Sequence, residues 1–91
     1  MAISVTLIDT DSYEVVVDGQ HETTHRVHMS QHYYRQLCGG TVTQEWVIVQ
    51  AFRFLLEREP NTSIMRTFDL PVIGQYFPEF ENDMADRLGM R

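Results

Sequence analysis

The segment His21-Glu22-Thr23-Thr24-His25 matches the HExxH pattern of zinc hydrolases. On a helix, two histidines four residues apart lie on one face and can bind a zinc ion, while the glutamate between them acts as a general base. The pattern therefore raises the hypothesis of a zinc-dependent hydrolase with His21 and His25 as metal ligands.

The residues around this segment favour a strand over a helix. The segment closely follows Asp18-Gly19, a strong signal for a hairpin turn, and its centre holds two β-branched threonines. In a strand, His21 and His25 would lie about 13 Å apart at roughly 3.3 Å per residue, too far for one ion to bind both. We therefore interpret the match as coincidental, and we expect no enzymatic activity and no cofactor.

All the histidines of the chain are close together in the sequence: His21, His25, His28 and His32. We favour solvated side chains on a polar strand and beside a helix. A pH response stays open as an alternative, because histidines ordinarily change charge near pH 6.5.

Length and charge narrow the class of protein. A chain of 91 residues is expected to form a single domain, residues 1–91, and its hydrophobic content of 43% is that of a folded globule. The net charge of −6 works against binding to nucleic acid, and no apolar stretch is long enough to span a membrane. Because Cys38 is the only cysteine and the N-terminus lacks a signal peptide, we expect a cytoplasmic protein.

The first third of the chain has the residue pattern of β-strands. Apolar and polar residues alternate over residues 3–7 and 13–17, and turn residues separate the two runs. A third strand fits residues 23–29, where one face would carry His25, Val27 and Met29. The pattern predicts a three-stranded antiparallel meander over about residues 2–29 and, with the helices that follow, an α+β fold.

From Ser30 onward the residue pattern is helical. The main buried helix is predicted over about residues 43–59, with Thr43 or Thr41 as its N-cap and Pro60 as its stop signal. Shorter helices are predicted after Ser30, through residues 61–68, from residue 69 and from residue 78.

The main helix is apolar nearly all round, so most of its sides need cover. The C-terminal segment of the same chain could supply that cover, but we favour a homodimer or another protein partner. The predicted dimer interface consists of Trp46, Val49, Phe52 and Leu56.

A resemblance to a known family runs over residues 24–58. The order Arg26-Val27-His28-Met29-Ser30, Tyr33-Tyr34, Leu37, a glycine turn, Thr43 and the apolar run 48–56 resembles the strand–helix–helix order of ribbon-helix-helix DNA-binding proteins. The resemblance implies that the strand pairs with its copy in a second subunit and enters the major groove. It also implies that the DNA-facing residues are Thr24, Arg26 and His28.

Several features depart from that family. The strand carries only one basic residue, Arg26, and the net charge opposes attraction to phosphates. Two earlier strands would also occupy the edge that the second subunit needs.

The segments Tyr33 to Gly40, Phe54 to Pro60 and Tyr76 to Glu81 resemble small bacterial proteins of unassigned function. The leading hypothesis is therefore a small non-catalytic protein-interaction or regulatory module. A ribbon-helix-helix regulator or antitoxin is the alternative, and a zinc-dependent hydrolase comes third.

Overall fold

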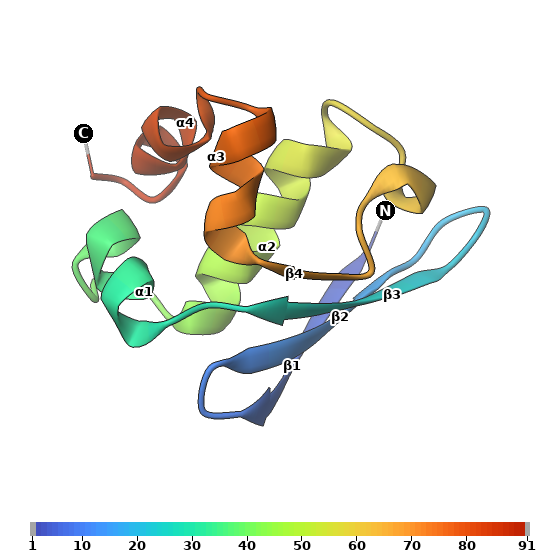
Figure 1. Ribbon diagram of the computed structural model, residues 1–91, viewed down its shortest axis with the longest axis horizontal. Coiled ribbons are helices and arrows are strands. Elements are labelled where there is room, and N and C mark those ends of the chain that lie inside the picture. Colours follow the sequence, from blue (N-terminus) through green and yellow to red (C-terminus); the bar gives the residue numbers. More distant parts are fainter. Residues whose placement is uncertain (1, 91) are drawn as a thin grey trace.

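A four-stranded sheet carries all the helices on one of its faces (Figure 1). This computed structural model describes residues 2–90. The predicted α+β class and the predicted antiparallel meander are confirmed, and a fourth strand completes the sheet in the order β1-β2-β3-β4. Within residues 2–90, no helix is long and apolar enough to cross a membrane.

The meander consists of β1 (Ile3–Asp9), β2 (Ser12–Val17) and β3 (Thr23–His28). Its register pairs Val5 with Val15 and Val15 with His25, so alternate side chains of all three strands point to the same face. That face carries the buried side chains of β2 and β3, and it forms the lower wall of the core: Tyr13, Val15, Val17, His25 and Val27.

The fourth strand corrects the prediction of a short helix through residues 61–68. Only Asn61–Ser63 forms a single 3₁₀ turn, and β4 (Thr67–Asp69) then runs parallel to β3. The Arg26 amide donates to the Arg66 carbonyl at 2.6 Å. Three residues are too few to show alternation, and their pairing depends on a strand about forty residues away, so local patterns could not reveal β4.

Two capped helices follow the meander. In α1 (Gln31–Cys38), the Ser30 hydroxyl accepts a hydrogen bond from the Tyr33 amide, and Gly39 ends the helix at φ 63°. In α2 (Gln44–Leu56), Thr43 is the N-cap and accepts from the Trp46 amide. The predicted end of α2 at residue 59 is three residues too late, because the backbone before Pro60 turns out of the helix.

The C-terminal segment packs on α2. This was one of the two alternatives for how the apolar sides of the main helix are covered. It forms a 3₁₀ turn at Leu70–Val72, α3 (Ile73–Tyr76) and α4 (Phe80–Arg87). The Phe54 ring of α2 meets the Phe77 and Phe80 rings at centroid distances of 5.9 and 5.1 Å. One side of α2 is therefore covered within the chain, and the sheet covers a second.

Two arginines, Arg58 and Arg87, link the end of α2 to α4 and the residue before it through ion pairs. The Arg58 guanidinium lies 3.6 Å from the centre of the Phe54 ring, donates to the Phe54 carbonyl and pairs with Glu79 at 3.1 Å. Arg87 bridges Glu57 and Asp83. The bond from Arg58 satisfies the Phe54 carbonyl near the end of α2, and the ion pairs link the residues that follow α2 to α4.

Candidate functional site

The HExxH match spans a turn and the start of a strand, not a helix. Residues 23–25 belong to β3, and His21 lies in the turn before it. The helix that an HExxH zinc site needs to place both histidines on one face is therefore missing at this position. Among residues 2–90 there is also no group of three histidine, cysteine or acidic side chains placed to hold a metal ion.

His25 corrects the expectation of solvated histidines, because only 1% of it is exposed. Its Nδ1 lies 2.7 Å from the Met65 carbonyl oxygen, and its Nε2 lies 2.8 Å from the Thr23 hydroxyl. A carbonyl only accepts, so Nδ1 donates to it, and in the tautomer that this bond selects Nε2 accepts from the Thr23 hydroxyl. Asn61 donates to the Thr23 hydroxyl and to the His21 carbonyl. The network ties residues 61–65 to β3. Both ring nitrogens of His25 are therefore engaged in hydrogen bonds within the protein.

The other histidines match the solvated interpretation: His21, His28 and His32 are exposed. The residues assigned to DNA in the alternative hypothesis, Thr24, Arg26 and His28, are also exposed, on the face of the sheet opposite the buried His25 and Val27. However, β3 is paired on both sides, with β2 and with β4. It offers no open edge to the same strand of a second subunit.

The open edge of the sheet belongs to β1, which pairs with β2 alone among the described strands. The Ala2 carbonyl accepts from the Asp18 amide, so by alternation Ser4 and Thr6 direct their peptide groups toward β2. The peptide groups of Ile3, Val5 and Leu7 therefore face outward. A bulge after Leu7 ends this regular segment.

Before the bulge, this edge lacks the features that usually prevent pairing with another chain. Natural edge strands are commonly short or carry lysine, proline or inward-pointing charges. β1 is seven residues long and holds no charged residue before Asp9, and 53% of Leu7 is exposed. The opposite edge, β4, is three residues long, includes Asp69 and is followed within two residues by Pro71.

Helix α2 extends the apolar surface beside β1. Trp46, Val49 and Leu56 recur at helical spacing, and each is partly or largely exposed, with Trp46 at 42%. Ile3 of β1 and Leu56 of α2 line a common hollow with Arg53 and Glu57. We define the β1–α2 face as the following residues: Ile3, Val5, Leu7, Trp46, Val49 and Leu56.

Phe52, the fourth residue of the predicted dimer interface, is not part of this face. It is fully buried, with its ring 5.4 Å from that of His25 and 6.1 Å from that of Phe68. Its position lies about 60° further round the helix than Val49, on the side that meets the sheet. A helix that is apolar on all sides does not reveal in its sequence which side the sheet covers.

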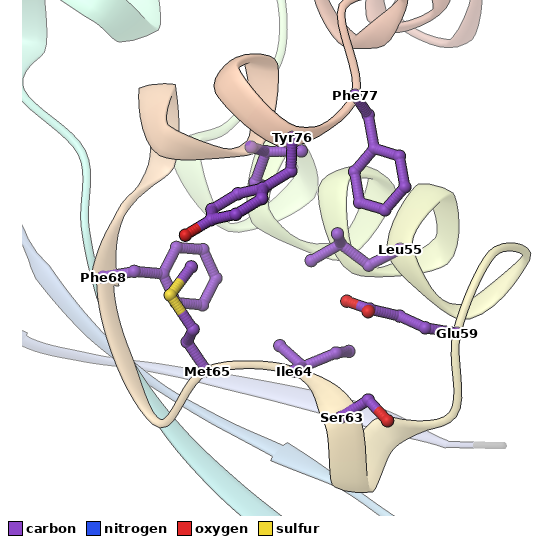
Figure 2. A pocket seen from close by; sticks show the side chains of 9 residues that line it. Leu55, Glu59, Ser63, Ile64, Met65, Phe68, Tyr76 and Phe77 are labelled. Atoms are coloured by element: carbon purple, nitrogen blue, oxygen red, sulfur yellow. The ribbon is translucent and has the colours of Figure 1, made fainter.

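A second surface lies at the other edge of the sheet, toward β4. It is a groove with a cavity of about 250 Å³ between the end of α2, the segment before β4, and α3 (Figure 2). We call it the β4–α3 groove, and its lining residues are Leu55, Glu59, Ser63, Ile64, Met65, Phe68, Ile73, Tyr76 and Phe77. The lining comes from four separate segments, so the spacing of residues in the sequence could not reveal that they form one groove.

Comparison of the chain with protein-family models, with curated proteins and with solved structures found no match in any of the three. The functional assignment therefore rests on the two surfaces themselves.

Proposed function

We propose that this chain is a non-catalytic protein-interaction module that works as a homodimer through the β1–α2 face. The observation that carries the proposal is the open edge of β1, which holds no charged residue before Asp9 and lies beside an apolar stripe of α2. Pairing of such an edge with another strand satisfies its outward peptide groups, and the neighbouring helix supplies apolar area to bury.

The residues of β1 favour a second copy of the same strand as the partner. Apolar and polar residues alternate symmetrically about Val5 in Ile3-Ser4-Val5-Thr6-Leu7. An antiparallel pair centred on Val5 would place Ile3 opposite Leu7 of the second copy, and Val5 opposite Val5. A two-fold axis requires this self-complementary arrangement, in which each subunit offers the same patch.

The helix stripes would meet across the same axis. Since α2 packs on β1 and Leu56 shares a hollow with Ile3, extending the sheet brings α2 of each subunit toward its copy. Arg53 lies on this stripe, 5.5 Å from the centre of the Trp46 ring, and forms no ion pair within residues 2–90. A dimer would cover this stripe.

DNA binding is the weaker proposal. Thr24, Arg26 and His28 remain accessible, but Asp69 lines the same shallow hollow as Arg26 and His28. A carboxylate there and a net charge of −6 both oppose approach of a phosphate backbone.

The mass in solution tests the dimer. We expect gel filtration with light scattering to give twice the chain mass of 10.7 kDa. Leu7→Lys should shift the protein to the monomer, because it places a charge on the face that would be buried. Thr6→Lys, on the opposite side of the same strand, is the matched control and should leave the dimer largely intact. A wild-type monomer at all concentrations, or equal behaviour of the two variants, would exclude this face.

A further inference from the structure

Glu59 is an unpaired carboxylate inside an otherwise apolar groove. The residue is half-buried, and within residues 2–90 its carboxylate forms neither a hydrogen bond nor an ion pair. In Figure 2 its carboxylate lies toward the middle of the β4–α3 groove, between Leu55 and Ile64. The neighbouring Arg58 is directed to Glu57, Glu79 and Asp83 instead. A carboxylate left without a cation in such surroundings is suited to a cation brought by a ligand.

Aromatic rings line the groove around this carboxylate. Phe68 and Tyr76 lie across the groove from Glu59, and Phe77 lies beside Leu55 (Figure 2). The faces of aromatic rings attract organic cations, and their apolar surface also covers a carbon skeleton. Met65 adds a flexible apolar side chain at the rim, of a kind that adapts to different ligands.

We propose that the β4–α3 groove is a binding site for a basic side chain, arginine or lysine, presented beside an apolar residue by a segment of a partner protein. Glu59 pairs with the cation, while the aromatic side chains cover its apolar stem and the neighbouring residue. The net charge of −6 would favour approach of a basic partner.

The size and the rim of the groove favour a protein segment over a free small molecule. Its cavity of about 250 Å³ lies below the roughly 300–1,000 Å³ typical of small-molecule pockets. Two of its lining side chains also extend beyond the cavity, with Tyr76 66% exposed and Met65 40% exposed. A ligand that fills the cavity alone would cover only part of each side chain, whereas a longer segment could also cover the rest.

The site goes beyond the proposed dimer and does not depend on it. The groove lies toward β4, and the β1–α2 face lies toward β1, at the other end of the strand order. Both grooves of a dimer would therefore remain open. The Leu7→Lys monomer should bind the same ligands, which separates failure of this proposal from failure of the dimer.

The test is a titration of isotope-labelled protein with the capped peptide Leu-Arg-Leu-Leu, followed by amide chemical shifts. We expect saturable shifts centred on residues 63–65 and 76–77. Glu59→Gln should weaken binding about tenfold, the equivalent of one charge-assisted hydrogen bond. Tyr76→Ala should weaken binding to a similar extent. Because Tyr76 is largely exposed, this substitution should not disturb the fold, so weaker binding would report on the groove itself.

Three controls make the result decisive. Glu14→Gln changes the net charge equally on an exposed position of β2 and should leave affinity unchanged. Citrulline in place of arginine should weaken the peptide as much as Glu59→Gln does, and butylguanidinium alone should bind at least tenfold more weakly. Equal affinity for Glu59→Gln and wild type, shifts outside the groove, or butylguanidinium as good as the peptide would each overturn the proposal. So would a lack of saturation at millimolar peptide.

Discussion

Replacing His25 with alanine is expected to lower the free energy of unfolding by about 3 kcal/mol. The substitution opens a cavity beside Phe52 and leaves the Met65 carbonyl without its donor. It also removes the acceptor of the Thr23 hydroxyl, so the polar contacts that tie residues 61–65 to β3 are weakened. Urea denaturation followed by circular dichroism measures the change.

His21→Ala is the matched control, because His21 is exposed and contributes only its backbone carbonyl to the network. Its effect should stay within about 0.5 kcal/mol, as for most surface substitutions. Equal losses from the two variants would show that the two histidines act together, as the zinc hypothesis supposes, and would contradict a purely structural role for His25.

Cysteine at position 5 is expected to link two chains almost completely under mild oxidation. In the proposed antiparallel pair, Val5 lies opposite its own copy in a hydrogen-bonded pair, with Cα atoms about 5.5 Å apart. That separation lies within the range of disulfides. Non-reducing electrophoresis of Val5→Cys should therefore show a covalent dimer.

Two controls fix the register of the proposed pair. Ser4→Cys should link poorly, since its copy would lie about 7 Å further along the strand. The wild-type chain holds only Cys38, which is fully buried and should not link at all. Efficient linking of Ser4→Cys with little linking of Val5→Cys would rule out pairing centred on Val5.

The meander could be predicted because its information is local. Alternating residues and the turn at Asp18-Gly19 fixed three neighbouring strands, and their observed bounds fall within residues 2–29. The same pattern placed His25 on one face with Val27 and Met29, which was a signal for its burial. The polar character of histidine outweighed that signal, and the acceptor that makes burial possible, the Met65 carbonyl, lies forty residues away.

The two surfaces differ in how far sequence could identify them. Trp46, Val49 and Leu56 were identified as an interaction stripe from helical spacing, whereas Phe52 shares their character and is buried by the sheet. The role of β1 depends on strand order, which leaves it at an edge. The residues next to Glu59 in the sequence gave no sign that it lies in an apolar groove, because the aromatic residues that face it come from β4 and α3.

The most direct test of the dimer is amide hydrogen exchange along β1, measured by NMR at high protein concentration. Ser4 and Thr6 direct their amides to β2, so they should exchange slowly whether or not a dimer forms. Pairing of two β1 strands predicts that the outward amides of Val5 and Leu7 are protected as well, and that Leu7→Lys removes the protection at Val5. Slow exchange at Ser4 and Thr6 with fast exchange at Val5 and Leu7 in the wild type would contradict the account.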